Sequence, residues 1–299
     1  MDAMRFFSIT EKSLIWWLQR LHTNRMRSAT LVIELFQYDF MQRAFFSATI
    51  IGILCAVLGV FVILRGMSFI GAGIAHASFG GVALGFLLGI NPILTAILFC
   101  VLTAWAIGFV HESGRIQEDT AVGIFFASTM AFGVLLIGFM RHYNVDFFSF
   151  IFGNILAISQ VDIYAAILLA IIVLLTLTVF FKEFLFLTFD AEMAQVVGIP
   201  VRKFNYLMLT LIALTVVVSI KAVGIVLVSA LIVTPAATAS LFTKDFKRLL
   251  MYSVLFGVGS CWLGLFLSAL GDLPSGATIV LTATLFFFLS SLITKWMNR

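Results

Sequence analysis

Nine long apolar stretches dominate this 299-residue chain. A helix needs about 20 predominantly apolar residues to cross the hydrocarbon core of a bilayer. Charged residues make up only 11% of the chain, against roughly 25% in soluble domains. Lipid must therefore be the solvent, and we predict an all-α polytopic membrane protein with eight or nine transmembrane helices. The candidate spans are 44–64, 67–89, 93–111, 120–140, 161–181, 204–221, 223–242, 249–270 and 276–294.

Two segments fall outside this pattern. Residues 1–43 are basic, and their longest apolar piece, "SLIWWL" (13–18), is too short for the core of a signal peptide. We expect an uncleaved amphipathic extension that lies on a membrane surface, followed by one membrane domain over 44–299. The apolar piece "FFSFIFGNILAIS" (147–159) is short for a span and is expected to be re-entrant or interfacial.

Lysine and arginine in the loops indicate the orientation, because cytoplasmic loops carry an excess of both. With the C-terminus inside, the outer loops after the extension hold only Arg141 and Lys221. This excess of basic residues in inner loops is enough to explain the net charge of +4. The charge therefore gives no reason to expect a nucleic-acid partner. Nine crossings would then leave the basic extension outside, unless one segment does not cross fully. The inner side holds Arg65, Arg115, Lys182, Arg202, Lys203, Lys244, Lys247, Arg248, Lys295 and Arg299.

His76, in "GAGIAHASFGG" (71–81), is the one strongly ionisable side chain deep within a candidate span. Ionisable groups inside a membrane are costly and mark transport pathways. The structural alternative is a neutral histidine that is hydrogen-bonded to a neighbouring helix. The small residues around it either let helices approach closely or leave space for a solute.

The inner stretch "LTFDAEMAQVVGIPVRK" (187–203) predicts a short capped helix. Asp190 suits the N-cap, and Glu192 lies in the first turn, where the helix dipole favours an anion. Gly198 can end the helix in the left-handed conformation, and Pro200 prevents its continuation. This helix of about two turns is either an ordinary capped loop or a docking element for a cytosolic partner.

Two further positions have both a structural and a functional interpretation. Pro235 lies within an apolar stretch and is expected to break or kink that helix. With Thr234, the broken helix would line the pathway, as in many transporters, or the kink would serve packing alone. Asp272 lies in an outer turn and is a weak candidate for a cation entrance. Sequence motifs for ATP hydrolysis or for hydrolytic catalysis are absent, so we expect no enzyme activity.

The order of these stretches resembles the permease subunit of the bacterial zinc/manganese/iron family of ABC transporters. The resemblance covers roughly residues 44–295. Its motifs are "LRGMSFIGAGIAHASFGGVALGFLLG" (64–89), "EDTAVGIFFA" (118–127), "DFFSFIFGNILAIS" (146–159), "FDAEMAQVVGI" (189–199), "IVTPAATA" (232–239) and "DLPSGATIVL" (272–281).

This resemblance implies a vitamin-B12-permease-like (type II) importer fold in the bacterial cytoplasmic membrane. It implies a divalent metal ion as substrate, with His76 on its path, and no permanently bound cofactor. A second permease subunit, identical or different, would complete the pathway. Two cytosolic ATPase subunits would power transport, and an extracytoplasmic metal-binding protein would deliver the ion. The coupling helix to the ATPase would be formed by Asp190, Ala191, Glu192, Ala194, Gln195, Val197 and Gly198.

One position departs from the family pattern. The second helix of the family often reads Gly-Asp-x-x-x-His, with the acid one turn before the histidine, but Ala72 occupies the acid position here. A neutral imidazole suits zinc or iron, whereas carboxylates better suit manganese, so we expect a slight preference for zinc. The alternatives are a permease for a metal chelate, such as a siderophore or cobalamin, and a membrane scaffold without transport.

Overall fold

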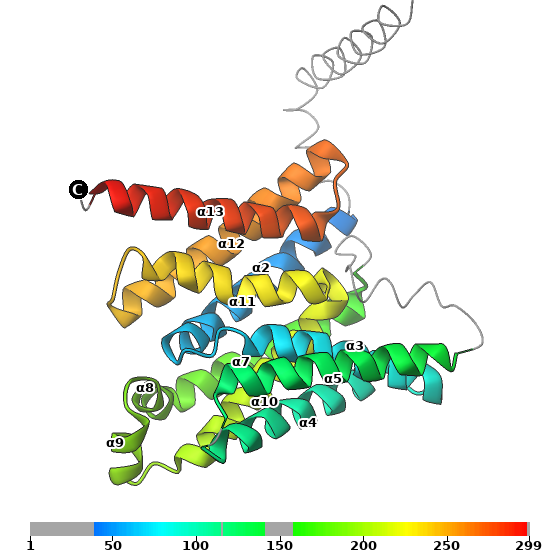
Figure 1. Ribbon diagram of the computed structural model, residues 1–299. Coiled ribbons are helices and arrows are strands. Elements are labelled where there is room, and N and C mark those ends of the chain that lie inside the picture. The colour runs from blue at the N-terminus through cyan, green and yellow to red at the C-terminus, as the bar shows by residue number, and fades with distance from the viewer. Residues whose placement is uncertain (1–38, 115, 141–157, 298–299) are drawn as a thin grey trace, which may run out of the picture. The chain divides into compact units, whose positions relative to one another are not determined.

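The computed structural model describes residues 39–114, 116–140 and 158–297. The chain divides into two units, Met1–Gln42 and Arg43–Arg299, and the second is described here. The helices are α2 (Asp39–Leu64), α3 (Ile70–Leu88), α4 (Pro92–Glu112), α5 (Glu118–Gly138), α7 (Gln160–Val179), α8 (Phe181–Phe189), α9 (Ala191–Val196), α10 (Val201–Val223), α11 (Ile225–Ser240), α12 (Phe246–Gly271) and α13 (Ser275–Met297) (Figure 1).

Each of the nine candidate spans coincides with one helix. Eight of the described helices are long and apolar enough to cross a membrane. The ninth, α11, has 16 residues and rises about 24 Å, somewhat less than the hydrocarbon core. The prediction of eight or nine membrane helices is therefore confirmed. The predicted N-terminal extension, up to residue 38, and most of the predicted re-entrant piece, 147–157, lie outside the described residues.

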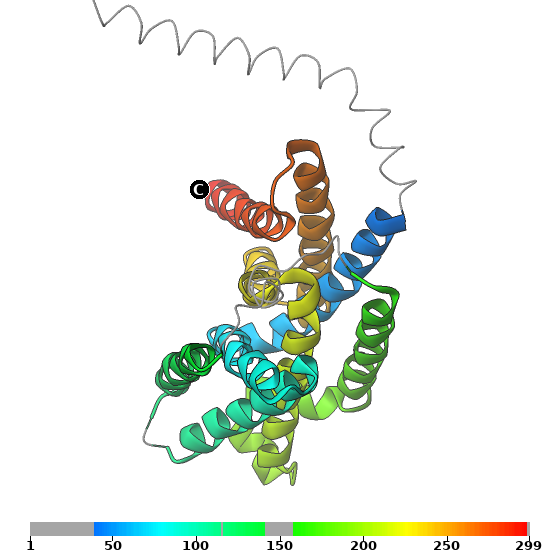
Figure 2. The ribbon, with the colours of Figure 1, turned by 90° about the vertical axis from the view of Figure 1, so that its right-hand side faces the viewer.

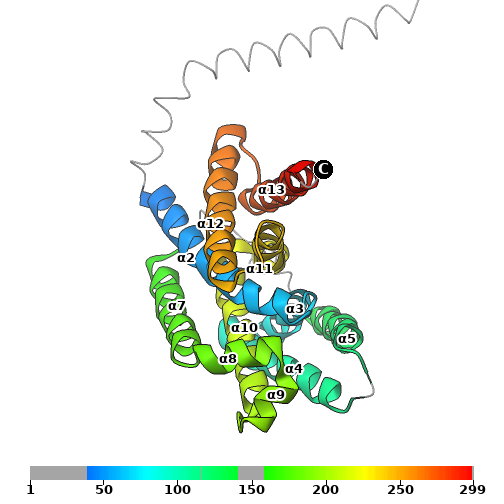
Figure 3. The ribbon, with the colours of Figure 1, turned by 90° about the vertical axis from the view of Figure 1, so that its left-hand side faces the viewer.

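Successive long helices run in alternating directions (Figure 1). The short helices α8 and α9 lie at the same end of the bundle as the C-terminus of α13. We call this the α9 end, and it is the end that the loop charges predict to be cytoplasmic. Seen along the long helices, α12 and α13 lie towards one edge and α4 and α5 towards the other (Figures 2 and 3).

Among the described helices, α3 packs against α4, α5, α10 and α11. Its glycines make this possible. A Cβ atom on Gly81 would lie 2.7 Å from Cα of Ala96 in α4, and one on Gly80 would lie 2.9 Å from the carbonyl oxygen of Thr129 in α5. Without a hydrophobic driving force between helices in lipid, such close backbone approach supplies the packing energy. At these two positions the small residues serve helix packing and leave no space for a solute.

Candidate functional site

His76 lies near the middle of α3, and its imidazole packs edge-on against the ring of Phe126 in α5, with centroids 4.5 Å apart. The side chain is only partly buried. Ala72, one turn earlier on the same face, is also partly buried. This face of α3 therefore stays open in the isolated chain, although most of the helix is buried.

Helix α5, which lies beside His76, leaves small residues exposed. Gly123, Ala127 and Ala131 recur at four-residue spacing, and all three are exposed. A Cβ atom added to Gly123 would meet no atom within 4 Å. We call these three residues the α5 face. Small residues at this spacing allow another membrane helix to approach closely, so the α5 face is suited to packing against a further subunit.

Among the residues that the structure describes, no group of three His, Cys, Asp or Glu side chains could hold a metal ion. His76 is therefore not part of a ligand cluster within the described part of one chain. An ion that reaches His76 would need further ligands from outside this set of described side chains, such as water or another subunit.

Helix α9 forms as the local sequence predicts. The carboxylate of Asp190 accepts a hydrogen bond of 2.8 Å from the backbone N–H of Met193. Gly198 adopts a left-handed φ of +91°, and the N–H of Ile199 donates to the carbonyl of Ala194 at 3.0 Å. These bonds satisfy backbone groups at both ends of the helix. The predicted caps are confirmed, although α9 ends at Val196 and not at Val197.

The outward side of α9 is apolar. Ala194 is buried against the rest of the protein, while Met193, Val196 and Val197 are 55%, 80% and 65% exposed. Phe189, at the end of α8, is also exposed. We call Phe189, Met193, Val196 and Val197 the α9 surface. It lies at the α9 end of the bundle, beside the ends of the long helices (Figure 1), and a clustered apolar surface of this kind is typical of a protein interaction site.

Phenylalanine rings connect α8, and with it α9, to three long helices. The ring of Phe184, which is fully buried, lies 6.2 Å from that of Phe61 in α2 and 5.6 Å from that of Phe204 in α10. Phe181 lies 5.6 Å from Phe246 in α12. Edge-to-face aromatic pairs add to the energy of simple burial. A displacement of α9 would therefore act on the ends of several membrane helices.

The model of the family described as the ABC 3 transport family matches residues 37–294. The chain belongs to this family. It is 40% identical over 257 residues to the manganese transport system membrane protein MntC of Halalkalibacterium halodurans, covering 86% of this chain and 88% of MntC. It is 37% identical over 259 residues to the chelated iron transport system membrane protein YfeD of Yersinia pestis, covering 86% of each.

A solved structure agrees with this assignment. The structure of PsaBC from Streptococcus pneumoniae in complex with Fab matches with a TM-score of 0.78 and 38% identity, over 88% of this chain and 94% of that one. The expected resemblance to metal-ion ABC permeases and the expected permease fold are confirmed. This ABC 3 family permease is a multi-pass protein of the bacterial inner membrane, and its membership of a transport family agrees with the expectation that it is not an enzyme.

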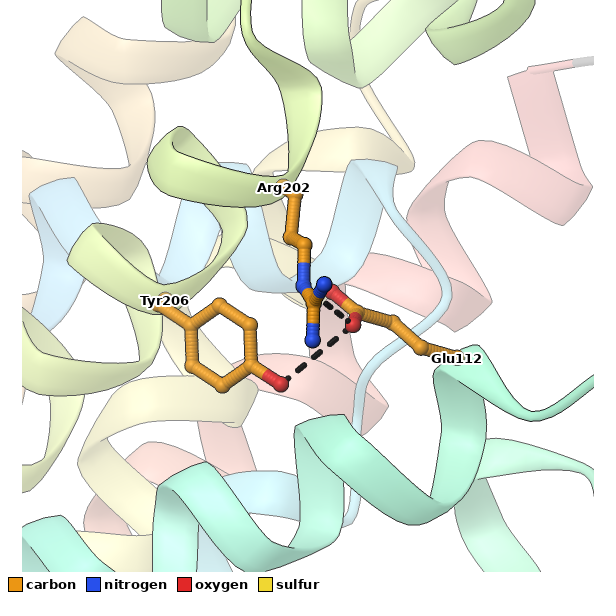
Figure 4. A network of polar contacts seen from close by, with 3 residues as sticks. All are labelled: Glu112, Arg202 and Tyr206. Atoms are coloured by element: carbon orange, nitrogen blue, oxygen red, sulfur yellow. Dashed lines mark hydrogen bonds and ion pairs between the residues drawn. The ribbon is translucent and has the colours of Figure 1, made fainter.

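A polar network joins α4 and α10 of the permease at the α9 end (Figure 4). Arg202 Nε lies 2.9 Å from Oε2 of Glu112, and the hydroxyl of Tyr206 donates to the same oxygen at 3.3 Å. The side chain of Arg202 is 70% exposed, so water screens this ion pair and it contributes little to stability. Sequence reasoning did not identify this network, because about 90 residues separate its partners and no local pattern pairs them.

Two other expectations had different outcomes. α11 of the permease continues from Ile225 to Ser240 with Pro235 inside it, so the helix is not broken at Pro235, and the expected alternative of a kink there stays a prediction. The missing N–H of proline removes one backbone bond, yet the helix persists, and nearby the hydroxyl of Thr238 donates to the carbonyl of Thr234 at 2.7 Å. Asp272 ends α12 in the left-handed conformation, with φ of 51°, which confirms the turn.

Proposed function

We propose that this permease imports a divalent transition-metal ion into the cytoplasm, powered by a separate ATPase. The observation that carries the proposal is His76, a partly exposed imidazole in the middle of a membrane-spanning helix. An imidazole in that setting can contact a cation on its way through the membrane. The 40% identity to a manganese transport membrane protein supports the same conclusion.

The pathway lies between two permease subunits. The open side of α3 with His76 and the α5 face support a second copy of this chain as the other subunit. Packing along Gly123, Ala127 and Ala131 would bring two His76 side chains towards one axis and supply two nitrogen ligands. Two imidazoles with water bind a divalent ion weakly enough for release, which transport requires.

We propose manganese as the principal ion, since MntC carries that metal in its name. The expectation of zinc rests on Ala72 alone, and zinc is the competing cation that this substitution favours. The name of YfeD refers to chelated iron, which keeps transport of a metal chelate as the alternative. Comparing uptake of the free ion with uptake of the same ion held by a chelator distinguishes the two.

The α9 surface is the docking site for a cytosolic ATPase, one on each permease subunit. Its exposed apolar side chains fit an apolar groove on the partner, a common mode of helix recognition. Asp190 and Gly198 hold the helix in shape, while Met193, Val196 and Val197 make the contact. An extracytoplasmic metal-binding protein delivers the ion at the opposite end, where Asp272 and its turn lie. Pro235 and Thr234 of α11 remain proposed lining residues of the pathway.

The test is ATP-dependent accumulation of radioactive manganese in proteoliposomes that hold the permease with its ATPase. His76→Phe is the decisive variant, because it keeps a ring beside Phe126 and removes the metal-binding nitrogens. We expect its uptake at limiting manganese to fall about tenfold or more, because loss of even a group that supports a metal ligand costs about 10–100-fold in metal affinity or activity. Tyr164→Phe, at an exposed position of α7, is the control. Unchanged uptake by His76→Phe would exclude His76 from the pathway, and a wild type that accumulates no metal would refute the function.

A further inference from the structure

The turn between α2 and α3 is held tightly at the α9 end. Gly66 adopts a left-handed φ of +74°, and the N–H of Met67 donates to the carbonyl of Val62 at 3.0 Å. The Met67 side chain is 3% exposed. Because α3 begins three residues later, at Ile70, this turn determines where the helix that carries His76 starts.

Arg65 extends from this turn to α10. Its Nη2 donates a hydrogen bond of 2.7 Å to Oδ1 of Asn205, across 140 residues of sequence. Asn205 lies in the second turn of α10, and only four residues, 197–200, separate α10 from α9. The hydrogen bond between Arg65 and Asn205 thus links the start of α10, which closely follows α9, to the turn that precedes α3.

The same arginine has an unused donor. Its Nη1 is buried, and so is Oε1 of Glu118 in the first turn of α5; neither atom has a hydrogen-bond partner among the described residues. Burial lowers the pKa of Arg65, and the opposite charge of Glu118 counteracts this effect. A buried polar atom without a partner is unfavourable, so a rearrangement that joins these two groups would be favoured.

We propose that Arg65 is a positioning residue that transmits movement of α9 to α3 by exchanging its partner, from Asn205 in this arrangement to Glu118 when α10 moves away. The inference rests on the proposed importer function, in which the ATPase displaces α9. A two-state contact of this kind can convert a small shift into a discrete rearrangement. Arg65 contacts no metal in this scheme; it sets the position of the helix that carries His76.

The experiment measures metal ions accumulated per ATP hydrolysed, in proteoliposomes that hold the full-length permease and its ATPase. For Arg65→Gln we expect this ratio to fall about tenfold, the factor that one hydrogen bond to a charged group contributes to an equilibrium. The amount of ATPase that co-purifies with the variant permease should stay within about twofold of the wild-type amount, because the α9 surface is unchanged. Arg65→Lys keeps the charge and a donor and should restore part of the ratio. Lys247→Gln removes an exposed charge from α12 and should leave the ratio unchanged.

Partner exchange makes a second prediction. Glu118→Gln should lower the ratio as well, and the double variant Arg65→Gln/Glu118→Gln should be no worse than Arg65→Gln alone, since both changes break one interaction. Additive losses, or an unchanged ratio in Arg65→Gln, would overturn the inference while leaving the importer function intact. If Arg65→Gln does not fold, Asn205→Ala tests the same hydrogen bond. A wild type without ATP-dependent metal uptake would overturn the function and this inference with it.

Discussion

Replacing Gly81 by alanine tests whether close packing of α3 against α4 holds the His76 helix in place. The new Cβ would lie 2.7 Å from Cα of Ala96 and 2.9 Å from Cβ of Phe99. Optimal carbon–carbon separations are about 3.5–4.0 Å, so the two helices must separate by about 1 Å. Overpacking of this kind costs about 1–3 kcal/mol, and the better helix propensity of alanine returns about 1 kcal/mol. Because the new Cβ would meet two atoms at or next to the α4 backbone, we expect an overpacking cost near the top of that range. The free energy of unfolding should therefore fall by about 1–2 kcal/mol.

Gly259→Ala in α12 is the matched control, because its new Cβ would meet only Cε2 of Phe286, at an ordinary 3.7 Å. Both variants are purified in detergent and titrated with dodecyl sulfate, and tryptophan fluorescence reports unfolding. Gly81→Ala should unfold at a lower mole fraction of dodecyl sulfate than the wild type, and Gly259→Ala at the same or a higher one. Metal uptake should fall with Gly81→Ala, since α3 moves. Equal midpoints for the two variants would refute the packing argument.

Three other predictions concern function. Val196→Asp, at a position that is 80% exposed, should lower stability by no more than about 1 kcal/mol, the cost of an anion at a helix C-terminus, yet abolish co-purification of the ATPase; full recovery of the ATPase would contradict the docking role. Ala72→Asp restores a carboxylate one turn before His76 and should shift the ratio of manganese to zinc uptake towards manganese, so an unchanged ratio would exclude this position from ion selection. Asp190→Ala removes the N-cap of α9, at a cost of about 1 kcal/mol, and should speed hydrogen exchange at the Met193 amide; unchanged exchange would show that the cap is not needed.

Elements that depend on local physics were predictable from the sequence. A backbone in lipid must satisfy its own hydrogen bonds, which leaves helices as the solution for apolar runs of this length. The predicted span 67–89 therefore corresponds closely to Ile70–Leu88. The caps of α9 are equally local, since Asp190 and Gly198 act within a few residues of themselves. Pro235 shows the limit of such reasoning, because α11 continues through it.

The polar contacts at the α9 end were not predictable in the same way. Arg65 appeared only as one of several basic residues in inner loops, and nothing near it in sequence identifies Asn205 as its partner. Arg202 likewise appeared only among the inner basic residues, and nothing in the sequence identified Glu112 as its partner. These pairs depend on which helices become neighbours, and hydrophobic runs that are apolar on every side carry little information about neighbours.

The proposed metal site could not be recognised as a ligand cluster in the sequence, for a related physical reason. A search of one sequence for clustered ligands assumes that one chain supplies the whole set, and the described part of this chain does not. If two subunits meet along the α5 face, each needs to contribute only one imidazole, and symmetry supplies the second. A single histidine per chain is then sufficient for a transient site, and the absence of an acid at Ala72 keeps the site weak. The partly exposed side of α3 is thus the property that the proposed pathway between two subunits requires.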